Sequence, residues 1–187
     1  MIYSPIPPND LWLPDIRRVP SPNCNQRPAN TPVDLLVIHN ISLPAGVFGG
    51  SCIEQLFTNC LDCNSHDSFQ DLQGLEVSAH FLIRRDGSAV QFVPLNLRAW
   101  HAGLSAFCGR ENCNDFSVGI ELEGTDSCPY TELQYQALAV LTARIMAVCP
   151  DISLERIVGH CDIAPQRKTD PGDSFNWNYY RQLLVQV

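Results

Sequence analysis

The apolar residues of this chain follow two different spacings, which predict strands in some segments and helices in others. A continuous apolar run at 35–38 is typical of a buried strand. Two further runs, at 77–83 and 89–93, enclose an Asp-Gly pair that favours a β-hairpin turn. Residues 117–123 alternate, so a strand there has an apolar face and an opposite face that carries Glu121.

Apolar residues spaced three or four positions apart predict three helices. The first covers about 52–61 and the last about 177–185. The middle helix begins at a capping box formed by Thr131 and Gln134, and ends near Cys149, before a proline. Five apolar positions continue this middle helix: Leu133, Ala137, Val140, Leu141 and Val148.

The segments between these elements are rich in glycine, proline and polar residues, which indicates loops at 43–51, 62–74, 94–116 and 159–176. Strands mixed with helices, together with a hairpin, predict an α/β fold with a mixed central β-sheet flanked by helices. We expect one domain over residues 1–187, in which the proline-rich segment 1–32 wraps the surface.

The balance of charge argues against one class of function. The 187 residues include 12 Lys and Arg against 20 Asp and Glu, a formal charge of −8, which disfavours a nucleic-acid partner. Positive charge is concentrated locally in four arginines between residues 84 and 110 and in the pair Arg167 and Lys168. Such clusters could receive an anionic ligand, since arginine suits bidentate recognition of carboxylates. Lys168 is the only lysine in the chain.

The nine cysteines are an odd number, so they cannot all pair within the chain. The sequence opens with neither a basic stretch nor a long apolar run, and no window approaches the ~18 apolar residues of a membrane span. We therefore expect a cytoplasmic protein with no membrane partner, whose cysteines are mostly thiols. Cys60 and Cys63 form a C-x-x-C without a second ligand pair at zinc spacing, and we interpret them as incidental.

Two histidines and an aspartate are candidates for metal binding. His39 lies at the end of a predicted buried strand, where α/β sheets place their ligands. His160 opens a loop that also carries Asp170. Two imidazoles and a carboxylate would make a three-ligand zinc site with one position left for a water nucleophile. Spacing alone leaves simpler roles open: a backbone hydrogen bond for His39, and the start of a turn for Asp170.

Other polar residues have similar alternatives. Glu121 is either aimed into a cleft, with a neighbouring glycine leaving room for a ligand, or solvated, as Glu123 on the same face could be. Lys168 would stabilise an oxyanion near a metal, or is a solvated loop lysine. Trp100 and His101 offer a flat apolar surface and a donor suited to a sugar or peptide, or Trp100 anchors its loop.

Five motifs then occur in one order: LLVIHNISLP (35–44), VSAHFLIRRDG (77–87), RAWHAG (98–103), CNDFSVGIELEGTD (113–126) and GHCDIAPQRKTDPG (159–172). In this order the sequence resembles the cytoplasmic AmpD-type N-acetyl-anhydromuramoyl-L-alanine amidases. These belong to the zinc amidase superfamily, which includes phage amidase-type lysozymes and peptidoglycan recognition proteins. The resemblance extends from about residue 17 to about residue 180.

The resemblance implies one Zn²⁺ per chain, held by His39, His160 and Asp170. It further implies Glu121 as the acid/base residue and Lys168 as the stabiliser of the intermediate. The residues implied to line the substrate groove are Asn40, Trp100, His101, Arg110 and Arg167. The implied reaction cleaves the amide between the lactyl group of anhydro-N-acetylmuramic acid and L-alanine of the stem peptide. It recycles cell-wall fragments and removes muropeptides that induce β-lactamase. We expect the protein to be a monomer.

The chain departs from the family pattern at two positions, since Glu76 and Asn112 stand where some members carry arginine, which leaves the peptide preference open. His80 lies in a well-matched motif and is predicted to be structural. The sequence leaves two other functions open. One is a binding module that keeps the fold without turnover, and the other is a thiol hydrolase with Cys161 beside His160 as nucleophile.

Overall fold

The structure is a computed structural model that describes residues 11–187. Its strands are β1 (Arg17–Arg18), β2 (Cys24–Gln26), β3 (Leu35–Ile41), β4 (Phe81–Ile83), β5 (Ala89–Gln91), β6 (Leu97–Ala99), β7 (Ala106–Phe107), β8 (Arg110–Glu111), β9 (Ser117–Glu123) and β10 (Ile157–Gly159). Its α-helices are α1 (Cys52–Phe57), α2 (Glu132–Val148), α3 (His160–Ile163) and α4 (Trp177–Leu184), and its 3₁₀ turns are η1 (Asp67–Leu72), η2 (Cys113–Asp115) and η3 (Leu154–Arg156).

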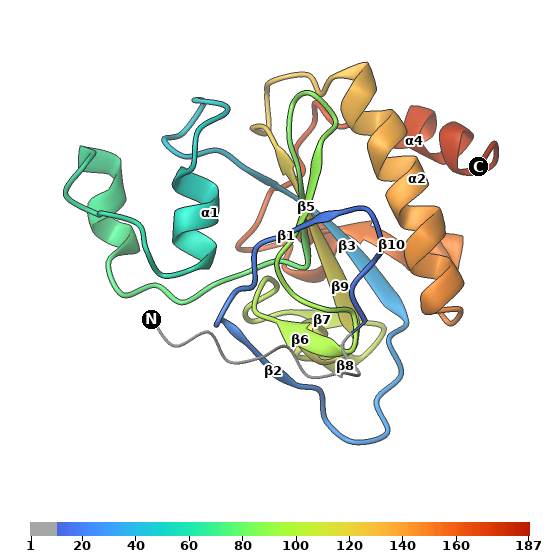
Figure 1. The fold of residues 1–187 in the computed structure, drawn as a ribbon. Coiled ribbons are helices and arrows are strands. Elements are labelled where there is room, and N and C mark those ends of the chain that lie inside the picture. The colour runs from blue at the N-terminus through green and yellow to red at the C-terminus, as the bar shows by residue number, and fades with distance from the viewer. Residues whose placement is uncertain (1–10) are drawn as a thin grey trace.

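Six strands form a mixed sheet in the order β1-β5-β4-β9-β3-β10 (Figure 1). The pairs β4–β9, β9–β3 and β3–β10 are parallel, whereas β4 and β5 are antiparallel. The predicted α/β fold with a mixed central sheet is therefore confirmed. The predicted hairpin is confirmed too, because β4 and β5 pair across a turn in which Gly87 adopts a φ of +81° that favours glycine.

Several predicted boundaries were wrong. Helix α1 ends at Phe57 rather than near residue 61, because the Thr58 hydroxyl donates to the Glu54 carbonyl and Asn59 adopts a left-handed φ of +59°. The predicted exposed loop at 62–74 contains η1, which is anchored by the buried Phe69. The other two long loops contain the short elements β6, β7, β8, η2 and α3.

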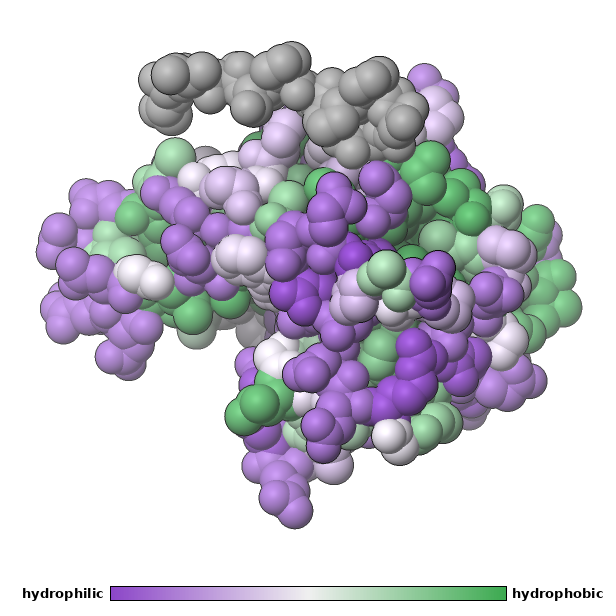
Figure 2. Space-filling model, turned by 90° about the horizontal axis from the view of Figure 1, so that it is seen from below, coloured by the Kyte–Doolittle hydropathy of each residue, from purple (hydrophilic) through white to green (hydrophobic). Residues whose placement is uncertain are grey.

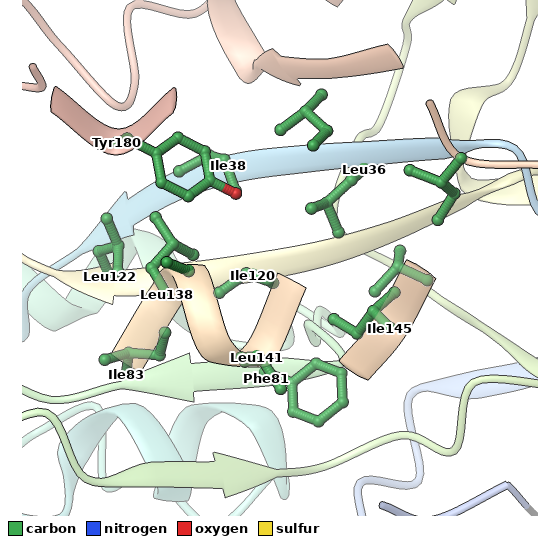
Figure 3. Close-up of a cluster of buried hydrophobic side chains, with 14 of the residues drawn as sticks. Leu36, Ile38, Phe81, Ile83, Ile120, Leu122, Leu138, Leu141, Ile145 and Tyr180 are labelled. Atoms are coloured by element: carbon green, nitrogen blue, oxygen red, sulfur yellow. The ribbon is translucent and has the colours of Figure 1, made fainter. Parts of the chain in front are cut away.

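Helices α2 and α4 pack together on one face of the sheet, on the right of Figure 1. Figure 3 shows the main core of this face, in which leucine and isoleucine side chains of β3 and β9 meet those of α2. Tyr180 of α4 reaches the same layer, and its hydroxyl lies 2.7 Å from Thr142 Oγ1. This layer leaves the opposite face of β3 and β9 to carry the polar side chains.

The middle helix was predicted correctly, but part of its buried face was not. Leu133 is 53% exposed and Val140 is 48% exposed, and Val148 is exposed as well. The buried face instead includes two polar residues, Gln134 and Thr142. Gln134 Nε2 donates to the Glu123 carbonyl at 2.9 Å, so its burial is compensated by a hydrogen bond that an apolar pattern cannot reveal.

The opposite face of the sheet carries the site. Leu36, Ile38, Ile120 and Leu122 point toward α2, so alternation directs His39 and Glu121 to the other side. Helix α1 and the turn η1 form a lobe on that side, at the left of Figure 1, and this lobe is mainly hydrophilic on the surface seen in Figure 2.

The N-terminal segment follows the edges of the fold where it is described. Strand β1 pairs with β5, and β2 pairs with β6. The prediction that residues 1–32 wrap the surface concerns residues 1–10 too, which lie outside the described residues. The assignment of one domain to the whole chain stays a prediction. Over residues 11–187, no helix combines the length and apolar character needed to cross a membrane.

Candidate active site

Three predicted metal ligands converge at one point. His39 Nδ1 lies 3.0 Å from His160 Nδ1 and 3.0 Å from Asp170 Oδ2, and the last two atoms are 3.1 Å apart. Tetrahedral zinc with ligand bonds of about 2.0 Å separates its ligand atoms by ~3.3 Å. The triangle therefore has the dimensions of three ligands around one small cation, and it is the only such group within the described residues.

The chemistry of the donor atoms also fits a cation. His160 Nε2 lies 3.1 Å from the Ala102 carbonyl, which can only accept, so Nε2 carries the hydrogen and Nδ1 of the neutral ring offers a lone pair. Burial lowers the pKa of His39 to about 4, which keeps this imidazole neutral. Burial disfavours the Asp170 carboxylate, but the contacts with both histidines outweigh it and hold the pKa of Asp170 well below its usual range.

Parallel pairing brings the two histidines together. His39 lies near the carboxyl end of β3, and Ile38 pairs with Gly159 of β10, directly before His160. Both rings are buried. Asp170 lies on the loop that follows α3, and its backbone carbonyl accepts a hydrogen bond from Cys161 N at 3.0 Å. The site thus depends on two adjacent strand ends and one returning loop.

Glu121 lies opposite His39 in the β3–β9 register. Its carboxylate is 9% exposed, and Oε2 is buried without a hydrogen-bond partner among the described residues. Burial raises the pKa of Glu121 well above its ordinary value, and the nearby Asp170 adds to this effect, whereas Lys168 lowers the pKa. An unpartnered carboxyl group in a cleft, with a raised pKa, is suited to proton transfer.

Two expectations about this strand were wrong. The space over Gly119 is not left for a ligand, because a Cβ there would lie 2.5 Å from the His101 ring. Glu123 is not solvated either, since it is 1% exposed. Its carboxylate accepts hydrogen bonds from the backbone N–H of Gly49 at 2.6 Å and from Arg84 Nη1 at 3.3 Å. Glu123 is thus a buried structural charge.

A cavity of about 710 Å³ opens beside the triangle. The cavity is lined by nine of the ten site residues predicted in the sequence analysis: His39, Asn40, Trp100, His101, Glu121, His160, Arg167, Lys168 and Asp170. Arg110 is not among the described residues that line it. The Arg110 guanidinium instead pairs with Asp34 at 2.7 Å and lies 3.7 Å from the centre of the Phe116 ring.

Two of these lining residues also support the site. His101 Nδ1 lies 2.9 Å from His39 Nε2, and its other nitrogen lies 3.1 Å from Ser117 Oγ, so His101 orients a metal-ligand candidate. Arg167 Nη2 donates to the carbonyls of Ala102 and Leu104, at 2.9 and 2.8 Å, and so braces the wall of the cavity.

The arginines between residues 84 and 110 do not form the ligand-receiving cluster that the sequence suggested. Arg84 pairs with Glu54 and Glu123, and Arg98 pairs with Asp115. Arg85 donates to the carbonyls of Glu123 and Pro129. Among the predicted basic residues, Arg167 and Lys168 are the two that line the cavity.

Sequence reasoning missed Thr125, Asp126 and Ser127, which also line the cavity. They follow the carboxyl end of β9, the neighbour of the strand that carries His39. Because ligands collect at the carboxyl edge of parallel strands, this position was a usable signal.

Two histidines and a carboxylate beside a buried glutamate, at the carboxyl edge of a largely parallel sheet, are typical of a metal-dependent hydrolase. The chain belongs to the N-acetylmuramoyl-L-alanine amidase family, Amidase_2, which matches residues 29–173. It is 56% identical over 173 residues to the 1,6-anhydro-N-acetylmuramyl-L-alanine amidase AmpD of Escherichia coli strain K12, covering 92% of this chain and 94% of that protein.

Two solved structures are similar to this one. The crystal structure of a selenomethionine AmpD derivative superposes with a TM-score of 0.90 at 55% identity, covering 92% of this chain and 96% of that one. The Escherichia coli amidase AmiD, in complex with its substrate anhydro-N-acetylmuramic acid-L-Ala-D-γ-Glu-L-Lys, superposes with a TM-score of 0.60 at 33% identity, covering 85% of this chain and 60% of that one.

Proposed function

We propose that this amidase uses zinc to hydrolyse the amide between anhydro-N-acetylmuramic acid and L-alanine in muropeptides released from the cell wall. The observation that carries the proposal is the triangle of His39, His160 and Asp170, with Glu121 facing the same cavity. The similarity to AmpD, and to an AmiD structure that holds an anhydromuropeptide, supports the choice of substrate.

The three ligand atoms would hold Zn²⁺, since neutral imidazole nitrogens and a carboxylate oxygen are its usual partners. When bound, zinc would supply a Lewis acid that polarises the scissile carbonyl and favours deprotonation of water. The protein holds its ligands ready for this role, because His101 and the Ala102 carbonyl fix the outer nitrogens of the two histidines.

Glu121 moves the proton. As a carboxylate it takes a proton from the attacking water, whose oxygen bonds to the lactyl carbonyl carbon. The protonated carboxyl group then donates to the nitrogen of L-alanine as the carbon–nitrogen bond breaks. A raised pKa stabilises the protonated form between these steps, while the positive charge of Lys168 favours the carboxylate beforehand. The Lys168 ammonium also opposes the negative charge that develops on the carbonyl oxygen.

The remaining lining residues would hold the substrate. Trp100 offers an aromatic surface to the sugar or peptide, and its indole nitrogen is held by Asn25 Oδ1 at 3.0 Å. Asn40 and Arg167 place polar groups on the cavity wall. Arg110 is not proposed as a substrate contact, because it is not among the described residues that line the cavity and its guanidinium pairs with Asp34.

Mass spectrometry of the products tests the proposal. The purified protein with an anhydromuropeptide should release anhydro-N-acetylmuramic acid and the intact peptide. A chelator should abolish the reaction, and added zinc should restore it. Amide cleavage that continues after verified metal removal would overturn the zinc assignment, and no cleavage by the zinc-loaded protein would overturn the proposed activity.

The two alternative functions have less support. A binding module has no need of a buried Glu121 carboxylate whose Oε2 has no hydrogen-bond partner among the described residues. For the thiol hydrolase, burial raises the pKa of Cys161, and Asp162 and Asp170 raise it further, which disfavours the reactive thiolate. Cys161 is also absent from the described residues that line the cavity. A Cys161→Ser variant should therefore keep its activity.

We place the enzyme in the cytoplasm as a monomer, where it would lower the level of muropeptides that induce β-lactamase. The nine cysteines all lie within the described residues and form no disulfide there, a state that a reducing compartment maintains. Size-exclusion chromatography with light scattering tests the monomer. Deletion of the gene in a host with inducible β-lactamase should raise expression of that enzyme.

A further inference from the structure

Asp126 connects two parts of the site without itself belonging to the metal triangle. Its Oδ1 accepts a hydrogen bond from Asn40 Nδ2 at 2.8 Å, and its Oδ2 accepts one from Thr169 Oγ1 at 2.5 Å. Asn40 directly follows His39 on β3, and Thr169 directly precedes Asp170. One carboxylate therefore links the strand that carries one metal-ligand candidate to the loop that carries another.

The rest of this loop is held by neighbouring contacts. Ser174 N donates to the Asp126 carbonyl at 3.0 Å. A Cβ at Gly172 would lie 2.2 Å from Asp126 Cα, so the two backbones are in close contact. The Tyr130 hydroxyl donates to the Pro171 carbonyl at 2.8 Å. These contacts hold the part of the loop that follows Asp170. The Asp126 carboxylate holds the part that precedes Asp170, where Thr169 lies next to Lys168.

We propose that Asp126 is a positioning residue. It holds Lys168 and Asp170 at the distances from His39 that metal binding and catalysis require. The proposal rests on the proposed function, because it assigns Asp126 to the same amidase site. Asp126 acts through its hydrogen bonds to Asn40 and Thr169. Loss of these bonds should let the loop that carries Lys168 and Asp170 shift. The shift would weaken metal binding and move the Lys168 ammonium away from the reacting carbonyl.

Two substitutions separate hydrogen bonding from charge. Asp126→Ala removes both acceptors. Asp126→Asn removes the negative charge but keeps the shape, since the amide oxygen can accept from Asn40 and the amide nitrogen can donate to the Thr169 hydroxyl. Asp173→Ala is the matched control, because Asp173 is an exposed carboxylate on the same loop and does not line the cavity.

The experiment measures kcat and KM on an anhydromuropeptide and, separately, zinc affinity by competition with a chromogenic chelator. We expect Asp126→Ala to weaken zinc binding by about 10-fold or more and to lower kcat by at least as much. KM should change less than kcat. Asp126→Asn should recover most of both losses, and Asp173→Ala should match the wild type.

Two results would overturn the proposal. One is an Asp126→Ala variant with wild-type kcat and zinc affinity, and the other is an Asp126→Asn variant as impaired as Asp126→Ala. If Asp126→Ala does not fold, Thr169→Val and Thr169→Ser provide the same contrast, because only serine keeps the donor. A wild-type protein without turnover would defeat the proposed function, while the zinc affinities would still decide the role of Asp126.

Discussion

His39 and Glu121 lie directly opposite each other in the parallel register of β3 and β9. Side chains at paired positions point to the same face of a sheet, so this register places a metal-ligand candidate and the proposed proton carrier in one cavity. The two residues lie 82 positions apart in the chain, and the pairing of their strands is what makes them neighbours.

Glu121→Gln should separate binding from catalysis. We expect a decrease of kcat by about 10²–10⁴-fold, because the amide cannot transfer the proton, while the zinc content stays that of the wild type. The thermal midpoint should be at least equal to that of the wild type, since a neutral amide replaces a buried carboxyl group whose Oε2 has no partner within residues 11–187. Kinetics, metal analysis and calorimetry measure the three effects.

Glu123→Gln is the matched control on the same strand and the same face. Glu123 is buried and pairs with Arg84, so its replacement by a neutral amide should lower the thermal midpoint of unfolding and leave kcat nearly unchanged. Equal turnover by wild type and Glu121→Gln would remove the role proposed for Glu121.

Zinc should stabilise the folded protein, and His39→Ala should abolish this effect. A ligand that binds only the native state raises the free energy of unfolding by about 4 kcal/mol at a thousand times its dissociation constant. Removal of one of three ligands should eliminate that gain at the same zinc concentration. Calorimetry with and without zinc tests this, with His66→Ala as the control because His66 is an exposed histidine far from the triangle in sequence. A similar zinc-induced shift in His39→Ala would exclude His39 as a ligand.

Local patterns predicted the strands β3, β4, β5 and β9 and the helices α1, α2 and α4, because each depends on neighbouring residues. The shorter strands and α3 were missed, and β4 begins at Phe81 rather than at residue 77. The apolar run before His39 and the alternation around Glu121 indicated the two strands that carry these residues. The roles of His39 and Glu121 were implied by the family resemblance. The arginine pairs could not be predicted, because Arg84 meets Glu54 and Glu123 only after distant segments have folded together. The position of Asp126 after β9 could have been recognised, but its two hydrogen bonds could not, since both partners come from other parts of the chain.

Helix α2 offers a direct test of the difference between pattern and packing. Leu138 is completely buried in the core of Figure 3, whereas Val140 is 48% exposed. Leu138→Ala should lower the free energy of unfolding by about 2–5 kcal/mol through loss of buried contacts and creation of a cavity. Val140→Ala should change it by less than about 0.5 kcal/mol. Urea denaturation measures both, and equal losses would show that the outer face of α2 is covered in solution.

Arg84→Met should destabilise the protein more than Arg98→Met. Arg84 is largely buried between Glu54 and Glu123, so its loss leaves a buried carboxylate without its cation, at a cost of about 3 kcal/mol. Arg98 and Asp115 are more exposed, and such pairs contribute at most about 1 kcal/mol. Urea denaturation of the two variants gives the comparison. A larger loss in Arg98→Met would contradict the assignment of Arg84 as a structural residue.

His80 should make the protein less stable in acid. The Gly119 N–H donates to His80 Nδ1 at 3.0 Å, and His80 Nε2 lies 3.1 Å from the Leu97 carbonyl, an arrangement that requires a neutral ring. Burial, aided by the positive charge of Arg27, lowers the pKa of His80 to about 3. In the unfolded chain the pKa of a histidine is about 6.5. Between pH values of about 3 and 6.5 the unfolded state therefore binds more protons than the folded state.

Stability should therefore fall as the pH falls from about 6.5 toward 3, and His80 should account for a loss on the order of 2 kcal/mol at pH 5. His80→Asn keeps an acceptor for Gly119 but does not titrate in this range. Denaturation at pH 8, 6.5 and 5, with a chelator present throughout, should show a shallower dependence on pH in the variant than in the wild type. The contributions of the other histidines cancel in this difference. Parallel curves for the two proteins would mean that His80 does not stay neutral in the fold.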